Sequence, residues 1–418
     1  MADAARDLDE ALIQGDRYRD DGRPVAEWDW LLANDPIHWT EPTGRETFWA
    51  ITRHRDVVEI TKQPELFSSE VGSILILTDA EVEARQRADD QFSGMRTIIT
   101  MDPPDHGMFR KLAAGYFTPR GIARLHDIVS ASADETFAEL RADGADSFDF
   151  VTRVAEHHSV RVLCAILGIE RELEDEILYI TDHVFDREDS SLTQEEKDQA
   201  AAELGQRTFA LFDAIIQDRR ANPRDDLATM LATAVLPNGE AMGPAETLGY
   251  YLIVFTAGHD TTKFALAGAA DLFLDNPAEF QRLRADQSLL MTATEEVVRC
   301  IAPVNYAKRT VMADYQLGDV HLREGERVAL FYGAANRDPA VFEQPGRFDV
   351  GRDPNRHLGF GWAEHYCLGA HLARASIAGV LDVMTTRIES LERAGEPTYS
   401  PGTLVHGHKT MPVAAHWA

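Results

Sequence analysis

The chain has 418 residues, and 44% of them are hydrophobic, which is enough to bury a large core. Acidic residues outnumber basic residues by 70 to 41, and the formal net charge is -29. A surface of this sign repels nucleic acid and anionic membranes, which argues against both as partners.

The three cysteines, Cys164, Cys300 and Cys367, are too few and too scattered for a disulfide framework, which favours a reducing compartment. The first residues are charged throughout and contain no signal-peptide core. The longest apolar run, at about 250–258, is shorter than the roughly 18 residues that span a bilayer. We therefore expect a cytoplasmic protein without a membrane anchor.

In the N-terminal part, residues 48–52 predict a strand, and residues 54–64 predict a short helix that ends at Pro64. Residues 68–100 are irregular, apart from a charged stretch that is compatible with a helix, and a long loop of this kind in a compact protein is more often functional than accidental. From about 105 to 300 the apolar spacing is mainly helical.

Three helices stand out in this helical part. Residues 159–169 predict a buried helix that places Cys164 in the core, as is usual for a free cysteine. Residues 199–220 predict a long amphipathic helix. Residues 243–277 predict an almost wholly apolar helix, with a proline near each end, that runs through the middle of the protein.

From residue 301 onward short strand patterns return, and one last helix is expected over roughly 369–388. The predicted fold class is therefore mainly α with a minor β portion, in a single domain over residues 1–418. Its β-rich segments, about 36–70 and 301–418, are expected to pack with a helical core at about 105–300.

A polar sequence, TAGHDTT at 256–262, interrupts the apolar central helix. Threonine hydroxyls can bond to a carbonyl one turn earlier, and Gly258 lowers helix propensity, so we expect a local widening or kink. Asp260 and Thr261 supply the acid and the alcohol that a proton relay needs, and His259 is interpreted as a hydrogen-bonded or pocket-edge residue. The alternative is a kinked helix whose buried polar groups are only satisfied.

Glu296 and Arg299 lie three residues apart and therefore on one face of a predicted helix. Their apolar neighbours favour a buried pair, although a solvated surface pair is the usual interpretation of this spacing. A buried pair needs further hydrogen bonds to offset desolvation, and Arg352 could supply them.

The segment HLGFGWAEHYCLGAHLA at 357–373 places Cys367 close to His365 and His371. On these residues alone it fits a metal cluster, a core cysteine or a thiolate that ligates a cofactor. The spacing of two and then four residues is not usual for zinc. A zinc site would also leave the polar sequence of the central helix without a role.

The order of these features resembles that of the cytochrome P-450 heme-thiolate monooxygenases of the soluble bacterial kind, over nearly the whole chain. AGHDTT at 257–262 resembles the oxygen-activating motif of the family's I helix, and EVVR at 296–299 resembles its ExxR pair, to which RFDVGR adds Arg352. FGWAEHYCLG at 360–369 resembles the heme loop, and MDPPDHGMFRKL at 101–112 resembles the C-helix segment with its HxxxR pair. The implied fold is the P-450 triangular prism, with heme between the I helix and the cysteine loop.

The resemblance implies that Cys367 is the axial ligand of the heme iron, where a thiolate donates electron density and favours O–O cleavage. It also implies that cationic side chains hold the heme propionates, with His357 as a further candidate. Glu296, Arg299 and Arg352 are then scaffold for the loop. The residues implied to contact heme b, which is iron protoporphyrin IX, are His106, Arg110, Ala257, Gly258, Arg309, Phe360, Gly361, His365, Cys367 and Gly369.

One position departs from the family's pattern, because Ala363 occupies the place, four residues before the cysteine, where glycine is usual. If the loop needs a positive φ there, alanine costs on the order of 1 kcal/mol or more. The ligand assignment does not depend on this residue, but the conformation of the loop does.

The implied reaction inserts one oxygen atom from O2 into a C–H bond of a hydrophobic small molecule, with Asp260 and Thr261 as the catalytic proton-relay residues. A peroxide-dependent peroxygenase of the same fold and a non-catalytic heme sensor or carrier are the alternatives. The acid–alcohol pair favours the O2-dependent reaction, because peroxide-using relatives typically lack it and a sensor needs no relay.

The chain contains no flavin or iron–sulfur motif, so electrons are expected from a 2Fe-2S ferredoxin with its ferredoxin reductase. Lys111 and Arg374 are the expected basic residues of the face that meets this partner, on a protein expected to be a monomer.

The expected substrate pocket is mainly aliphatic with a few polar groups, which suits a hydrophobic molecule that carries one oxygen function. Several short stretches resemble those of bacterial terpene-alcohol hydroxylases, so a terpenoid is favoured, with a steroid or fatty acid second. The implied pocket residues, besides part of 71–98, are Tyr250, Ile253, Val254, Ala257, Val304, Asn305, Val405 and His406.

Overall fold

The computed structural model describes residues 2–72, 74–86, 96–118, 121, 125–144, 146–184 and 193–418. Over these residues the fold is mainly helical with a minor β portion, as predicted. The helices are α1 (Ala2–Ile13), α2 (Gly15–Asp21), α3 (Val25–Asn34), α4 (His54–Thr61), α5 (Asp79–Gln86), α6 (Asp105–Ala114), α8 (His126–Ala142), α9 (His157–Leu167), α10 (Glu174–Val184), α11 (Gln194–Ala221), α12 (Leu227–Ala232), α13 (Pro244–Asp275), α14 (Pro277–Ala285), α15 (Leu290–Ile301), α16 (Tyr332–Ala335) and α17 (Ala370–Arg387). The strands are β1 (Ile37–Thr40), β2 (Phe48–Ile51), β3 (Phe67–Ser68), β4 (Ser147–Asp149), β5 (Tyr306–Val311), β6 (Tyr315–Leu317), β7 (Val320–Leu322), β8 (Arg327–Phe331), β9 (Ile388–Arg393), β10 (Thr398–Tyr399), β11 (His408–Thr410) and β12 (Pro412–Trp417).

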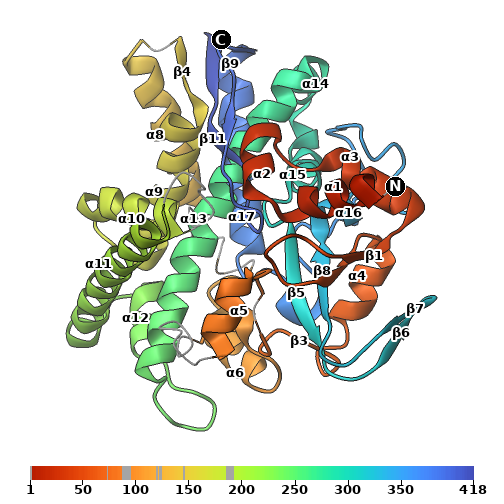
Figure 1. Ribbon diagram of the computed structural model, residues 1–418. Coiled ribbons are helices and arrows are strands. Elements are labelled where there is room, and N and C mark those ends of the chain that lie inside the picture. Colours follow the sequence, from red (N-terminus) through yellow and green to blue (C-terminus); the bar gives the residue numbers. More distant parts are fainter. Residues whose placement is uncertain are drawn as a thin grey trace.

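Helix α13 runs through the molecule between helices α10, α11 and α12 on one side and strands β5 and β8 on the other (Figure 1). It begins at Pro244, where a missing N–H costs no hydrogen bond, and it ends before Asn276 and Pro277. Its N-terminal half belongs to one core cluster with α9, α11 and α12, and its C-terminal half belongs to another with α8, α15 and α17. The apolar sequence is therefore buried on several sides, as predicted for a helix that crosses the core.

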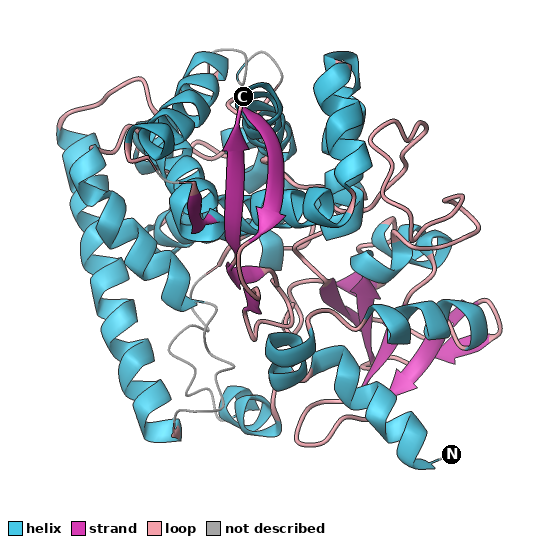
Figure 2. Ribbon diagram, turned by 90° about the horizontal axis from the view of Figure 1, so that it is seen from above, coloured by secondary structure: helices cyan, strands magenta, loops and turns pink. Residues whose placement is uncertain are grey.

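The larger sheet lies on the opposite side of α13 from α10, α11 and α12 (Figures 1 and 2). Its strand order is β1-β2-β8-β5-β3, with β2 and β8 parallel and the other pairs antiparallel. Four of the five residues of β8 are buried, which fits its place in the middle of the sheet. A smaller sheet of order β4-β12-β9 joins the C-terminal strands to the strand that precedes α9.

The chain carries its functional segments at the ends of buried elements. Helix α15 ends at Ile301 and leads through Ala302, with a φ of 34°, into β5. Helix α17 begins three residues after Cys367 and packs against α15 and α13. Within the irregular segment at 68–100 the charged stretch contains helix α5, in agreement with its helical interpretation, and residues 73 and 87–95 lie outside the described part. No helix within the described residues has the length and apolar character needed to cross a membrane.

Candidate active site

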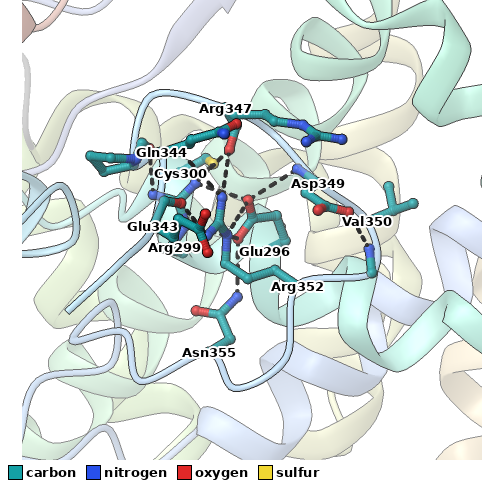
Figure 3. A network of polar contacts seen from close by, with 12 residues as sticks. Glu296, Arg299, Cys300, Glu343, Gln344, Arg347, Asp349, Val350, Arg352 and Asn355 are labelled. Carbon is teal, nitrogen blue, oxygen red and sulfur yellow. Dashed lines mark hydrogen bonds and ion pairs between the residues drawn. The ribbon is translucent and has the colours of Figure 1, made fainter. Parts of the chain in front are cut away.

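A buried ionic network joins α15 to the segment that precedes the cysteine loop (Figure 3). Arg299 Nε and Nη2 donate to the two carboxylate oxygens of Glu296 over 2.7 and 2.8 Å. Arg352 Nε lies 3.0 and 3.1 Å from the same oxygens, and Asn355 adds a bond of 3.0 Å. Glu296 and Arg299 are 0% and 2% exposed, so the predicted burial of the pair is confirmed.

The rest of the Arg299 guanidinium binds backbone carbonyls, because its Nη1 donates to Asn336 and Pro345 and its Nη2 to Arg347. The side chain of Asn336 in turn accepts from the Leu358 N–H over 2.6 Å, at the start of the cysteine loop. A buried charge is tolerated when its hydrogen bonds are complete. The network therefore fixes the loop to α15 through a chain of satisfied bonds.

The cysteine loop contains two residues in the left-handed region, Gly361 with a φ of 70° and Ala363 with a φ of 54°. The Cys367 N–H donates to the Phe360 carbonyl over 2.8 Å and closes the loop. The position that departs from the family's pattern thus has the positive φ that glycine adopts without strain, and alanine occupies it. We conclude that Ala363 adopts this left-handed conformation at a local cost.

The Cys367 side chain is accessible, yet surrounding protein raises the pKa of its thiol. Burial is the main cause, and the Gly369 N–H and the charges of Arg110 and Arg374 act in the opposite direction. A sulfur that faces a recess inside the protein is accessible and is also surrounded by protein, which accounts for its exposure and for its raised pKa. By contrast, Cys164 is 1% exposed in the core, as predicted, and burial raises its pKa to about 12.

Helix α13 continues as an α-helix through the polar sequence without a break, and the widening or kink stays a prediction. The Thr261 hydroxyl bonds to the Ala257 carbonyl over 2.6 Å, and Thr256 makes the same bond one turn earlier to Leu252. These bonds replace no backbone bond, which explains why the helix continues. Ala257 and Gly258 are exposed although the residues on both sides of them are buried. They therefore border an opening beside the middle of the helix.

Asp260 faces a charged and polar cluster inside the fold. Lys263 Nζ lies 3.0 Å from Asp260 Oδ1 and 3.8 Å from a carboxylate oxygen of Glu156, whose side chain is 16% exposed. His259 is fully buried, its Nδ1 lies 2.9 Å from Ser159 Oγ, and burial lowers its pKa well below the usual value. His259 is therefore a hydrogen-bonded interior residue, in line with the first of its two interpretations.

Cations gather beside the cysteine loop. Arg309 is 5% exposed and donates to the Lys308 carbonyl, and no carboxylate of the described residues lies within ion-pair distance of it. Arg110 donates to the Tyr366 carbonyl over 2.6 Å. Burial lowers the pKa of Arg309, which shows how poorly the interior compensates its charge.

Two histidines, His106 and His365, lie beside these two arginines. Their ring centres lie 4.3 Å apart, and His365 Nε2 lies 3.1 Å from Ser69 Oγ. Burial, together with the charges of Arg309, His106 and Arg110, lowers the pKa of His365 to about 2. His106 Nδ1 is buried with no hydrogen-bond partner among the described residues, although Glu364 lies 3.5 Å away. These groups fit heme, because its two propionates would supply the missing negative charge and acceptors.

The structure corrects two of the assignments around this cluster. His357 does not join the cations, because its Nε2 lies 2.8 Å from Glu295 behind the loop. Arg374 also binds Glu295, over 2.5 and 3.0 Å, and its side chain is only 20% exposed. Its charge is neutralised within the protein, so Arg374 is not a free surface cation. Lys111 of α6 is exposed as expected.

The polar pocket candidates are also corrected. The Asn305 side chain is fully buried and donates to the Thr403 carbonyl over 2.9 Å. The His406 ring packs against Tyr18 and Tyr399, and its Nδ1 lies 3.0 Å from the Ser400 carbonyl oxygen. The Asn305 amide nitrogen and His406 Nδ1 thus join backbone segments, whereas Asn305 Oδ1 is buried with no hydrogen-bond partner among the described residues.

The other pocket candidates fall into two groups, one with buried side chains and one with accessible side chains. Tyr250 is buried, with its hydroxyl bonded to the Phe109 carbonyl over 3.1 Å, and Val405 is 5% exposed. Ile253, Val254, Ala257 and Val304 remain accessible at least in part. Of the candidates at 71–98, residues 73 and 87–95 lie outside the described part. The accessible wall is therefore aliphatic, with Thr261 as its polar member.

Sequence reasoning missed Lys263 and Glu295. Lys263 stands three residues after Asp260, the same spacing that identified the Glu296 pair, so it could have been found. Glu295 has no such signal, because its partners lie 62 and 79 residues away. Among the described residues no three His, Cys, Asp or Glu side chains form a group that could hold a metal ion, which leaves the zinc interpretation without support.

Comparisons with known proteins agree with this site. The sequence profile of the family described as Cytochrome P-450 matches residues 71–384. The chain belongs to the cytochrome P-450 family. It is 32% identical to cytochrome P-450-terp of a Pseudomonas species over 415 residues, covering 96% of this chain and 95% of the relative. It is 29% identical to linalool 8-monooxygenase of Pseudomonas putida, covering 92% and 93% of the two chains.

Solved structures give the same result. A crystal structure of a P-450 from Novosphingobium aromaticivorans superposes with a TM-score of 0.88 at 33% identity and covers 99% of both chains. A Mycobacterium marinum P-450 in complex with pseudoionone superposes with a TM-score of 0.85 at 30% identity and covers 93% and 94%. The P-450 fold and membership of this heme-iron oxidoreductase family are therefore established, and with them the predicted monooxygenase class.

Proposed function

We propose that the protein is an O2-dependent heme-thiolate monooxygenase that binds heme b through Cys367. The observation that carries this proposal is the accessible Cys367 close to the buried guanidinium of Arg309, which has no carboxylate of the described residues within ion-pair distance. Heme supplies the oxygen chemistry when bound. Arg110, Arg309, His106 and His365 would hold its propionates, and the Glu296 network holds the loop in place.

The chain's own contribution to the reaction lies on α13. Thr261 is half-accessible at the opening and Asp260 lies behind it in the charged cluster. We assign to this acid–alcohol pair the delivery of protons at the carboxylate and hydroxyl oxygens, which a peroxide-dependent enzyme or a sensor does not need. The aliphatic wall beside it excludes water and orients an apolar substrate.

The absorbance of the reduced protein with CO tests the ligand assignment. We expect a band near ~450 nm, because a thiolate ligates the iron. Cys367→Ser is expected to abolish it, whereas Cys164→Ala, at the buried cysteine, is expected to keep it. A wild-type band near ~420 nm in folded protein, or an unchanged ~450 nm band in Cys367→Ser, would contradict the proposal.

We propose a terpenoid as substrate, with a steroid or fatty acid second. Support comes from the aliphatic wall and from relatives that are named for terpene and linalool oxidation. Relatives named as steroid C26-monooxygenases, 29% identical, keep the second class in view. Titration with a panel of terpenoids, steroids and fatty acids should shift the heme Soret band most strongly for a terpenoid. A panel in which only steroids or fatty acids shift the band would refute the terpenoid.

We propose that electrons come from a 2Fe-2S ferredoxin with its reductase, and that exposed Lys111 belongs to the docking face. Lys111→Glu should raise the ferredoxin concentration needed for half-maximal reduction without changing the CO band. An unchanged dependence on ferredoxin would remove Lys111 from this face.

A further inference from the structure

Glu295 holds two side chains behind the cysteine loop, apart from the Glu296 network. Arg374 Nε and Nη2 lie 2.5 and 3.0 Å from its two carboxylate oxygens. His357 Nε2 lies 2.8 Å from Oε2, and the Gly359 N–H donates to His357 Nδ1 over 3.2 Å. Because Nδ1 accepts, Nε2 carries the ring proton and donates it to Glu295.

Hydrogen bonds from His357 and Arg374 thus hold the Glu295 carboxylate on α15. Burial alone would raise the pKa of Glu295, but the hydrogen bonds from His357 and Arg374 and the charge of Arg374 lower it to about 2. Glu295 is therefore an anion that neutralises Arg374. Adjacent carboxylates on one helix thus anchor different segments, since Glu296 binds Arg299 and Arg352.

The Arg374 guanidinium reaches the residues that frame the cysteine. Its Nη1 donates to Tyr366 Oη over 3.0 Å, and its central carbon lies 4.5 Å from the centre of the Phe360 ring. Tyr366 directly precedes Cys367, and Phe360 accepts the Cys367 N–H. The cation is thus fixed in position by a carboxylate, a phenol and an aromatic face, all on the cysteine side.

We propose that Arg374 is a positioning residue for the iron ligand and that Glu295 sets how strongly its positive charge acts on the Cys367 thiolate. This inference rests on the proposed heme-thiolate function. A cation beside the thiolate stabilises the reduced iron centre, which carries one more negative charge, and a carboxylate beside the cation opposes this effect. The pair therefore tunes the reduction potential, which a surface docking cation would leave unchanged.

Opposite single variants in the heme-loaded full chain test the proposal. Arg374→Met removes the cation and leaves the carboxylate, so the midpoint potential should fall. Glu295→Gln removes the carboxylate and leaves the cation, so the potential should rise. We expect each change to reach up to about tenfold in the equilibrium constant for one-electron reduction, or ~59 mV. The double variant should return toward the wild-type value.

The chain offers a matched control at Arg207 of α11. Arg207 Nε lies 2.9 Å from Glu176, and its guanidinium carbon lies 3.7 Å from the centre of the Tyr179 ring. The same kind of ion pair and aromatic contact thus occurs on α10 and α11, away from the cysteine loop (Figure 1). Arg207→Met should leave the potential unchanged.

Arg374→Lys and the CO band separate charge from loop structure. Arg374→Lys keeps the charge and should keep the potential close to that of the wild type. Single variants that shift the potential in the same direction and move the CO band toward ~420 nm would mean a loosened loop and overturn the proposal. Unchanged potentials with weaker ferredoxin binding would overturn it in favour of docking. A wild-type protein without a ~450 nm band would instead refute the heme-thiolate function itself.

Discussion

The two sides of the candidate heme site are built differently. On the cysteine side, the Arg299 guanidinium binds a carboxylate and the carbonyls of Asn336, Pro345 and Arg347, and Glu296 receives three further donors. All donors of this guanidinium are used, although Asn355 Oδ1 has no hydrogen-bond partner among the described residues. On the α13 side, Asp260 and Lys263 form a buried pair, but the neighbouring His259 Nε2 has no hydrogen-bond partner among the described residues. Both nitrogens of the nearby buried His158 also lack one.

This difference indicates two kinds of task. A network in which every donor is used has one low-energy arrangement, and it fixes the geometry of a ligand loop. A cluster with spare donors and acceptors has more than one arrangement of similar energy, which suits groups that accept and release protons. We therefore expect substitutions on the cysteine side to affect stability first, and those on the α13 side to affect turnover first.

Arg299→Ala should produce the largest effect. It removes the bonds to Glu296 and to three carbonyls in a fully buried site, so we expect a loss of about 3–5 kcal/mol in the free energy of unfolding. Little heme-loaded protein should be recovered, because the backbone carbonyls of Asn336, Pro345 and Arg347 would lose their buried donor. Denaturant unfolding and the ratio of heme to protein absorbance measure both effects.

A matched surface pair provides the control. Arg337 makes two 2.7 Å bonds to Asp29, as strong in geometry as the buried pair, but Asp29 is 48% exposed. Arg337→Ala should cost only about 0–1 kcal/mol, because exposed pairs are screened by water. Equal losses for the two variants would contradict the assignment of Arg299 to the structural anchor.

Asp260→Asn should separate turnover from stability on the other side. It leaves Lys263 near Glu156, which lies 3.8 Å away and can still balance the charge, so we expect a smaller stability loss than for Arg299→Ala. Turnover with O2 should fall on the order of 10²-fold, because the relay loses its acid. Unfolding and product formation are measured on the same preparation.

Thr261→Ala sharpens this comparison. The hydroxyl makes a single bond to the Ala257 carbonyl, so its removal should hardly change stability. We expect electrons to be diverted into hydrogen peroxide, while Thr261→Ser keeps coupling close to the wild-type value. Unchanged coupling in Thr261→Ala would mean that the relay uses other groups.

The sequence predicted the features that lie within one segment. The bounds of α13 follow from local spacing, the apolar neighbours of Glu296 and Arg299 indicated their burial, and the family resemblance identified the cysteine loop. The partners of Glu295 could not be predicted, because nothing in an exposed-looking carboxylate shows that residues far along the chain converge on it. The direction of side chains could not be predicted either. Asn305 and His406 point to backbone carbonyls, and no sequence pattern indicates that these carbonyls lie close to them.

Ala363→Gly should give the smallest effect and one of opposite sign. Ala363 has a φ of 54°, which costs an L-residue about 1–2 kcal/mol relative to glycine. Glycine also gains entropy in the unfolded chain, which offsets about 0.4–1 kcal/mol of this relief. We therefore expect a net gain of up to about 1 kcal/mol with an unchanged CO band. Ala202→Gly, in the exposed middle of α11, should instead lose about 0.5–1 kcal/mol. If both variants lost stability equally, Ala363 would not be strained, and the cysteine side would contain no backbone strain at this position.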